Sequence, residues 1–397
     1  MGTNTYPVPS SGSSTSTVLP VNASSVLLDG ALTSATSYTT TINGNGGIAY
    51  LVAGDNPANF TVGGNFYTVP ANTVSATTTA VGSSSSVTVS DGGYVQTAPA
   101  SFTASTMPSS TQWYGVAYGA GTFVAVGGNA NTAGAYSTNG STWTANTMPN
   151  ATWRSVTYGN GIFVAPAGST GAYSSNGITW TSMTMSSGLS WASSTYGNGT
   201  FVAVASGSGG VSYSINGINW TSSTMPSTSG WDAVTYGNGY FVAVATTSST
   251  GAYSSNGVTW TASTLPSAFT WKGATYGTGT FVTVASGTSG LAYSNTYGIT
   301  WTAGTMPSSS NWYSVTYGNG YFVAVAFTSS TAAAYSSNGI SWTAATLPSA
   351  SNWYAITYGN GTYVAVQSSA TTAGSYFQLS ALLPVSFGIY AGPTTIY

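Results

Sequence analysis

Residues 231–245 read Trp-Asp-Ala-Val-Thr-Tyr-Gly-Asn-Gly-Tyr-Phe-Val-Ala-Val-Ala, and versions of this stretch occur seven times in the chain of 397 residues. Each version begins with a tryptophan and places a Tyr-Gly-x-Gly turn before an apolar run. A fixed period of this kind is typical of proteins built from one repeated supersecondary unit. The seven first-series tryptophans lie 38 to 41 residues apart, at Trp113, Trp153, Trp191, Trp231, Trp271, Trp312 and Trp353.

Each repeat reads as four short strands joined by turns. The Asn256-Gly257 pair of one repeat favours a tight hairpin, in a turn type whose two central residues both take positive φ. In that repeat the strands are expected at 231–236, 240–245, 252–254 and 258–265. Four short strands in a repeat of about 40 residues are the pattern of a propeller blade. The sequence therefore predicts an all-β protein with a seven-bladed β-propeller.

A second tryptophan recurs in the fourth strand of six repeats, and the two series together account for all 13 tryptophans. A residue fixed at one place in every blade usually packs between neighbouring sheets, and a buried aromatic ring removes about 150–250 Å² from water. We therefore assign both series to the core, with sugar stacking as the alternative. The second-series tryptophans are Trp143, Trp180, Trp220, Trp260, Trp301 and Trp342.

The seventh repeat lacks the fourth strand that the other six contain. A matching segment lies upstream, where residues 102–108 read Phe-Thr-Ala-Ser-Thr-Met-Pro beside Trp-Thr-Ala-Ser-Thr-Leu-Pro at 260–266. We expect this segment, near Phe102, to be the outer strand of the last blade, because joining the two ends of the ring removes an open sheet edge.

Composition excludes several classes of function. The chain has 2 basic and 4 acidic residues and no histidine, cysteine or glutamate, so the common general bases, thiol nucleophiles and zinc ligands are missing. We expect no enzyme activity, no cofactor and no metal, although calcium on backbone carbonyls and one aspartate stays open. Two cations cannot neutralise a run of phosphates, so nucleic acid is not expected as a partner. The apolar runs are too short for membrane insertion, and no signal peptide is visible.

The segments 173–180 (Tyr-Ser-Ser-Asn-Gly-Ile-Thr-Trp) and 253–260 (Tyr-Ser-Ser-Asn-Gly-Val-Thr-Trp) resemble the Asp-box repeat of sialidase-like propellers, over about residues 98–376. Asparagine stands in place of the aspartate, and the turn is one residue shorter except at 294–301. Sialidases need an arginine triad, a Tyr and Glu pair and an acid Asp. Arg154 is the only arginine and glutamate is absent, so the resemblance implies blade hairpins without sialidase activity.

The composition and the short recurring motifs of the repeats show a second resemblance. Tyr-Gly-Asn-Gly turns followed by Phe-Val-Ala-Val in a chain rich in Ser, Thr and Gly look like the propeller modules of bacteriophage tail and fibre proteins and of bacterial surface adhesins. This similarity implies a protein of a virion or of an extracellular surface.

Four parts follow along the chain. Residues 1–24 are rich in Ser, Thr and Pro and read as an arm. Residues 25–95 alternate apolar runs with turns and are expected to form a small β-sandwich or β-roll for assembly or anchoring. The propeller occupies 96–376. The tail 377–397 lies outside the repeat and is expected to pack on the propeller or on a neighbouring chain.

One position varies strongly between repeats that are otherwise monotonous. It follows each first-series tryptophan and forms the variable column: Tyr114, Arg154, Ala192, Asp232, Lys272, Tyr313 and Tyr354. Strands that begin here are expected to line the central channel, so the column would encircle one mouth of the ring. Function concentrates on variable positions of a fixed scaffold. We expect ligand binding at Tyr114, Arg154, Asp232, Lys272, Tyr313 and Tyr354.

Two other interpretations of the column stay open. Its charges could simply satisfy one another at the channel mouth. Catalysis by Asp232 and Lys272 would require shifted pKa values, and no second carboxylate of the repeats stands beside Asp232.

The sequence thus predicts a non-enzymatic virion or cell-surface structural protein of fibre, spike or decoration type, whose propeller face recognises a glycan or receptor. We expect other subunits of a homo-oligomer to be bound through the N-terminal region. The alternatives are a coat or filament subunit without any ligand, and a secreted lectin-like propeller.

Overall fold

The computed structural model describes residues 101–129, 131–369 and 371–378, together with the backbone of seven N-terminal strands. The chain divides into two compact units, Met1–Thr97 with Ser380–Tyr397, and Ala98–Leu379. The described residues form strands, turns and bends and contain no helix. This agrees with a sequence rich in β-branched and aromatic residues. From residue 379 onward, the predicted tail 377–397 lies outside the described residues.

The first unit contains short strands that pair in parallel. Its two sheets have the orders β1-β3-β5 and β2-β4-β6-β7, so the chain alternates between them up to β6, and β7 joins the same sheet as β6. The strands are β1 (Asn4–Pro7), β2 (Ser16–Leu19), β3 (Ser25–Asp29), β4 (Thr39–Ile42), β5 (Ile48–Leu51), β6 (Asn59–Gly63) and β7 (Ser86–Ser90). Two of them, β1 and β2, fall within residues 1–24, the segment that the sequence analysis takes as an arm. Threonine, which is frequent in this segment, favours strands.

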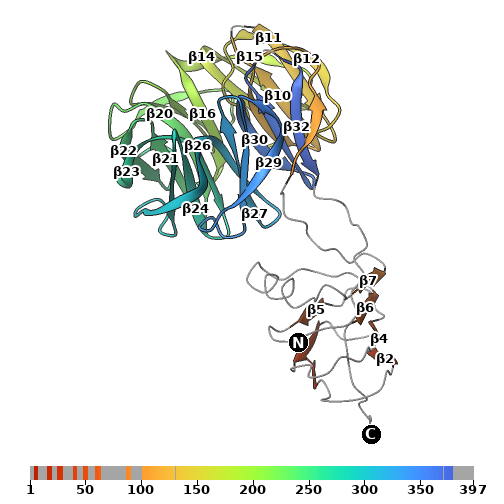
Figure 1. Cartoon of the computed structure of the whole chain (residues 1–397). Helices are drawn as coiled ribbons and strands as arrows, with labels where there is room; N and C mark the ends of the chain where they lie inside the picture. Colours follow the sequence, from red (N-terminus) through yellow and green to blue (C-terminus); the bar gives the residue numbers. More distant parts are fainter. Residues whose placement is uncertain are drawn as a thin grey trace. The chain divides into compact units, whose positions relative to one another are not determined.

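The second unit is a β-propeller, in which antiparallel sheets stand around a centre (Figure 1). One separate sheet contains β9 (Trp113–Gly119), β10 (Thr122–Gly127), β11 (Asn131–Ser137) and β12 (Thr144–Ala151). Another contains β13 (Thr157–Gly159), β14 (Ile162–Ser174) and β15 (Thr181–Leu189). A third contains β16 (Trp191–Gly197), β17 (Thr200–Ala205), β18 (Gly210–Ser214) and β19 (Thr221–Thr224). A fourth contains β30 (Trp353–Gly359), β31 (Thr362–Gln367), β32 (Ala373–Gln378) and β8 (Thr103–Thr106).

The other strands form one ten-stranded series where the sequence predicts three more separate blades. They are β20 (Trp231–Gly237), β21 (Tyr240–Ala245), β22 (Ser248–Ser254), β23 (Thr261–Gly277), β24 (Thr280–Ser286), β25 (Thr288–Ser294), β26 (Thr302–Gly318), β27 (Tyr321–Phe327), β28 (Ser330–Ser336) and β29 (Thr343–Ser351). The expected seven separate blades are corrected to four separate sheets and this series.

The long strands β23 and β26 explain the continuous series. Each has 17 residues and pairs with the preceding strand through its first part and with the following strand through its last part. In β23 the connection stays extended because it is itself paired: Phe269 lies opposite Ser248 of β22, and Thr270 lies opposite Ser286 of β24. The strand is therefore continuous from its pairing with β22 to its pairing with β24.

The predicted closing strand is confirmed. Strand β8 pairs antiparallel with β32, with Thr103 opposite Tyr376 and Thr106 opposite Ala373. The side chain of Phe102 is buried, and its ring centroid lies 5.8 Å from that of Phe377. A segment from before the first repeat therefore completes the sheet of the last repeat.

Seven glycines at the end of the first strand of each repeat lie against a tyrosine ring of the next repeat. A Cβ atom built on Gly119 would stand 2.0 Å from Cγ of Tyr158, so only glycine allows this approach. The same contact occurs at Gly159, Gly197, Gly237, Gly277, Gly318 and Gly359. The ring opposite Gly359 is that of Tyr118 in the first repeat, so the cycle of contacts closes.

The two tryptophan series differ in burial. All seven first-series tryptophans are at most 2% exposed, which places them between the sheets. In the second series Trp220 is buried and the other five are partly buried. Most second-series rings donate Nε1–H to the carbonyl of the preceding hairpin glycine, for example Trp143 to Gly140 at 3.0 Å. The second series therefore fastens the outer hairpins.

The Asn-Gly hairpins differ from the turn type expected. Both residues have positive φ in the first turn of a repeat, at Asn160 (46°) and Gly161 (81°). At the later Asn256-Gly257 pair only the glycine has positive φ, at 73°. There the Asn256 side chain oxygen Oδ1 accepts hydrogen bonds from the backbone N–H groups of Val258 and Thr259, both at 2.9 Å. A side-chain cap replaces the second left-handed residue.

Candidate ligand-binding site

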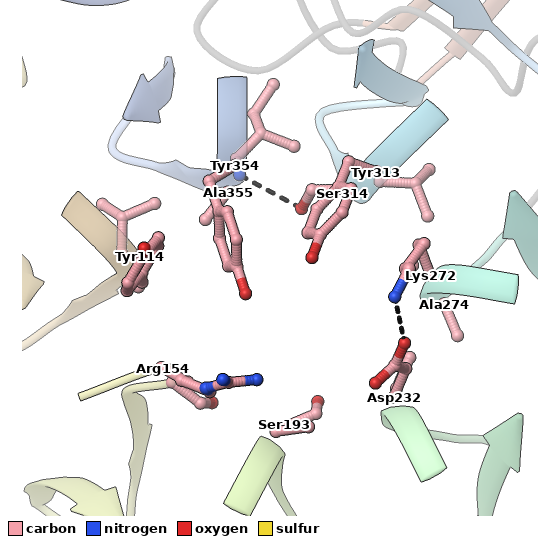
Figure 2. Close-up of a pocket in the computed structure, with 18 of the residues that line it drawn as sticks. Tyr114, Arg154, Ser193, Asp232, Lys272, Ala274, Tyr313, Ser314, Tyr354 and Ala355 are labelled. Atoms are coloured by element: carbon pink, nitrogen blue, oxygen red, sulfur yellow. Dashed lines mark hydrogen bonds and ion pairs between the residues drawn. The ribbon is translucent and has the colours of Figure 1, made fainter. Parts of the chain in front are cut away.

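All seven positions of the variable column line one cavity in the propeller (Figure 2). They stand at the start of β9, β16, β20 and β30, within the long β23 and β26, and, for Arg154, just before β13. The space open to water-sized molecules is about 190 Å³. The predicted site residues brought together here are Tyr114, Arg154, Asp232, Lys272, Tyr313 and Tyr354. Residues spread over 240 positions of sequence thus share one wall.

The next position along each first strand also lines the cavity, and the sequence interpretation missed it. It holds only Gly, Ala or Ser, and this restriction to small residues is the signal that could have revealed it. The residues are Gly115, Ser155, Ser193, Ala233, Gly273, Ser314 and Ala355. A larger side chain at this level would fill the channel.

Serines at this second position connect neighbouring first strands. Ser193 Oγ accepts a hydrogen bond from the backbone N–H of Val234 at 3.2 Å, and Ser314 Oγ accepts one from Ile356 at 3.2 Å. At Gly273 a Cβ atom would stand 3.0 Å from the carbonyl oxygen of Tyr313. The inner strands are therefore close together and directly bonded, which gives the cavity a rigid wall.

Asp232 and Lys272 form an ion pair inside the cavity. Lys272 Nζ donates to Asp232 Oδ2, and the two side chains are 19% and 12% exposed for lysine and aspartate respectively. The same Nζ lies 5.4 Å from the ring centroid of Tyr313, within cation–π range. These two charges neutralise each other, as the alternative interpretation of the column expects. Asp232 Oδ1 has no hydrogen-bond partner among the residues that the structure describes.

The three tyrosines pack on one another. The ring centroid of Tyr354 lies 4.4 Å from that of Tyr114 and 4.6 Å from that of Tyr313, both at tilted angles. Tyr313 also packs on Phe327 at 4.9 Å. Tyr114 donates its hydroxyl to Gln112 Oε1 at 2.9 Å. Because Tyr354 is enclosed between two neighbours, the rings present mainly edges and hydroxyl groups, and less free face for stacking than the sequence suggests.

The hydroxyl groups of Tyr313 and Tyr354 stay protonated at neutral pH. Burial raises the pKa of Tyr313 above its ordinary range, the neighbouring Tyr354 and Asp232 raise it further, and Arg154 partly offsets this. Burial likewise raises the pKa of Tyr354. Figure 2 shows both hydroxyls pointing into the cavity. They can therefore donate hydrogen bonds to a bound molecule as well as accept them.

Arg154 extends its guanidinium into the cavity from the repeat that follows the repeat of Tyr114 (Figure 2). Its side chain is partly buried. Within residues 101–378, apart from 130 and 370, its guanidinium has no hydrogen bond or ion pair. Its neighbour in the ring is Ala192, which leaves room between Arg154 and Asp232. The lining residues therefore carry two cations and one carboxylate, and the unbalanced charge is on Arg154.

No group of three or more His, Cys, Asp or Glu side chains that could hold a metal occurs among the described residues. No helix there is long and apolar enough to cross a membrane. The cavity's carboxylate is already paired with a lysine.

No family model and no curated protein matches the chain. Solved structures do match in fold. Virginiamycin B lyase from Staphylococcus aureus aligns with a TM-score of 0.61 at 11% identity, over 69% of this chain and 98% of its own. YCF48 bound to D1 peptide aligns with a TM-score of 0.57 at 14% identity, over 71% of this chain and 96% of the YCF48 chain. The WD40 β-propeller domain of Doa1 aligns with a TM-score of 0.56 at 10% identity, over 70% of this chain and 96% of the Doa1 domain. At these identities the likeness shows the β-propeller fold alone.

Proposed function

We propose that this chain is a non-enzymatic structural protein of a virion or cell surface, of fibre, spike or decoration type, whose central cavity recognises a glycan or another receptor. One observation carries the proposal: the position that varies most between the repeats lines a single cavity. The surrounding positions are monotonous because they build the scaffold. Variation confined to one wall of a cavity is what a recognition site requires.

The finer architecture belongs to the same proposal. We infer that each of the seven repeats corresponds to one blade, with three blades in the ten-stranded series. The seven glycine–tyrosine contacts, which return from Gly359 to Tyr118, support this count. The similarity to Asp-box hairpins is supported by the capping role of Asn256. The proposed relation to phage fibre and adhesin modules rests on the texture of the repeats.

The chemistry of the cavity favours binding over catalysis. Its carboxylate on Asp232 is held by Lys272, and the chain has no histidine. The virginiamycin B lyase with a histidine-to-alanine substitution is described as catalytically inactive. A chain without histidine lacks the group whose loss abolishes that enzyme's activity, so we do not extend the lyase reaction to it.

We further propose that the first unit binds other subunits of a homo-oligomer. In its two parallel sheets the edge strands β1, β5, β2 and β7 each have one partner among the described strands. Strand edges of this kind can accept a strand from another chain. Native mass of the full chain beside a chain starting at Ala98 tests this. A defined oligomer that becomes a monomer supports the proposal, and two monomers contradict it.

Binding of the full chain to a panel of immobilised glycans and to intact cells tests the recognition function. We expect Tyr313→Ala and Arg154→Ala to weaken binding at least tenfold. Tyr240→Ala is the matched control, because this tyrosine begins β21 beside the turn at the far end of the strands. Equal binding by all variants, each with an unchanged thermal unfolding midpoint, would show that the cavity is not the recognition site.

A further inference from the structure

The charges of the cavity set the first requirement for a ligand. Lys272 and Asp232 neutralise each other, while Arg154 has no partner among the described residues. A partly buried cation without a counter-charge is unfavourable, because it loses hydration and gains no attraction. A ligand with one negative charge would balance it, so an anionic ligand gains most from this site.

The geometry of the anion follows from the side chains beside it. The planar guanidinium of an arginine matches carboxylate and phosphate groups through two parallel hydrogen bonds. A phosphate dianion would need a second free cation, yet the only other cation is already paired with the carboxylate of Asp232. That carboxylate would also repel a second negative charge. A single carboxylate therefore suits Arg154 better than phosphate does.

The rest of the wall is suited to hydroxyl groups. Asp232 Oδ1 is free to accept a hydrogen bond, and the protonated hydroxyls of Tyr313 and Tyr354 point into the space. Ser193 Oγ accepts from the backbone of Val234, which leaves its own O–H as a donor. A ligand with several hydroxyl groups, each able to donate and accept, satisfies this set.

The size of the space limits the ligand to a small unit. About 190 Å³ is below the roughly 300–1,000 Å³ of cavities that enclose a drug-sized molecule. Ala192, the smallest residue of the variable column, stands between Arg154 and Asp232 in the order of the ring and also lines the cavity. One sugar residue, free or at the end of a longer glycan, fits this description.

We propose that the cavity binds the carboxylate-bearing sugar of an acidic glycan, with its carboxylate on Arg154 and its hydroxyl groups on Asp232, Tyr313 and Tyr354. This inference rests on the proposed recognition function and names its ligand class. Arg154 supplies the preference for acidic over neutral sugars. The aspartate and the tyrosines supply the preference for a sugar over a simple carboxylate.

Titration of the full chain with oligosaccharides of glucuronic acid, with the corresponding glucose oligosaccharides, and with acetate and inorganic phosphate tests the proposal. We expect the acidic oligosaccharide to bind about ten- to a hundredfold more tightly than the neutral one, as a charged hydrogen-bonded pair provides. Acetate and phosphate are expected to compete weakly. Because Arg154 is only partly buried, added salt should screen its attraction to the ligand carboxylate and weaken binding of the acidic oligosaccharide.

Two variants separate the contributions. Arg154→Ala should remove the preference for the acidic oligosaccharide without lowering the thermal unfolding midpoint, because the guanidinium has no partner to lose among the described residues. Ala192→Leu fills the space and keeps every charge, so it should reduce binding of both oligosaccharides. Tyr240→Ala should change neither. Ala192→Leu also keeps the test decisive if Arg154→Ala folds poorly.

The outcomes distinguish this inference from the recognition function. Equal affinity for acidic and neutral oligosaccharides, or unchanged preference in Arg154→Ala, would overturn the role of the carboxylate and leave glycan recognition standing. Tighter binding of phosphate than of the acidic oligosaccharide would also overturn it. Absence of binding to these ligands, to the glycan panel and to cells would defeat the recognition function itself.

Discussion

Gly359 packs against the aromatic ring of Tyr118, and through this contact the last repeat meets the first. A Cβ atom on Gly359 would stand 2.0 Å from Cγ and 2.3 Å from Cδ1 of the Tyr118 ring. No side chain fits at that distance unless the ring moves away. The closed cycle of repeats therefore depends on a residue without a side chain at the junction between the two ends of the propeller.

Gly359→Ala is expected to lower the free energy of unfolding by about 1–3 kcal/mol, as forced overpacking typically does. Gly188→Ala is the control, because the atom nearest to its Cβ would be 3.8 Å away, and it should change stability by less than about 0.5 kcal/mol. Chemical denaturation of both variants measures the difference. Equal effects would show that the junction has room to adjust.

Phe102→Ala is expected to lower the free energy of unfolding by about 3–5 kcal/mol, the usual cost of removing a buried phenylalanine. The side chain is 6% exposed and packs near Phe377 in the sheet that β8 completes. Thr103→Ala, at the exposed first residue of β8 and next to Phe102, should cost far less. A small effect of Phe102→Ala would mean that β8 does not hold the ring closed.

The ion pair between Asp232 and Lys272 should appear as a coupling free energy. We expect a double-mutant cycle with Asp232→Asn and Lys272→Met to give about 0.5–3 kcal/mol, the range for directly interacting residues. Either single variant leaves one partly buried charge without its partner. The double variant should therefore lose less stability than the sum of the losses in the two single variants. Additive effects in thermal or denaturant unfolding would contradict a direct interaction.

Asn256→Ala should destabilise its hairpin by about 0.5–2 kcal/mol, because its side chain caps two backbone N–H groups. Asn256→Asp keeps the accepting oxygen and should retain most of the stability. Melting temperatures of the two variants beside the parent chain measure this. A loss of equal size in both would mean that the amide nitrogen, and not Oδ1, is the important group.

Alkaline pH should destabilise the folded chain. Burial raises the pKa of several tyrosines above the ordinary 10.0, namely Tyr313, Tyr317, Tyr321, Tyr354, Tyr358 and Tyr363. Above about pH 10 the unfolded chain then binds fewer protons than the folded one, so the free energy of unfolding falls as pH rises. This stability is fully present below pH 10.

Unfolding midpoints measured from pH 8 to 12, together with tyrosinate absorbance, check this expectation. Some tyrosines should ionise only as the chain unfolds. Between pH 5 and 8 the midpoint should change little, because the chain has no histidine to titrate there. Complete tyrosine ionisation in the folded chain near pH 10 would contradict the buried positions.

Much of the architecture could be predicted from local patterns. The period of the first-series tryptophans predicts a propeller, and the match of residues 102–108 to 260–266 predicts the closing strand. Both predictions succeed because the same pattern of strand residues recurs in every repeat. The turn type at Asn256 was wrong, since a side-chain cap and a left-handed backbone can both follow an Asn-Gly pair.

The sequence predicted which residues line the cavity, but it did not predict how their side chains pair with one another. Placing the variable column on a single wall needs only the period, and all its members do line one cavity. The pairing of Asp232 with Lys272, the enclosure of Tyr354 between two rings and the isolation of Arg154 depend on side-chain directions across the ring. No spacing in the sequence encodes those directions.

The sequence by itself determined the repeat, the strand pattern, the residue types of the cavity wall and the segment that closes the ring, because all of these follow from local chain geometry and periodicity. Only the tertiary structure decided that strands β20 to β29 form one continuous series through β23 and β26, and that Arg154 keeps an unbalanced charge. These features arise when residues of different repeats come together, where the geometry of neighbouring strands decides which charge finds a partner.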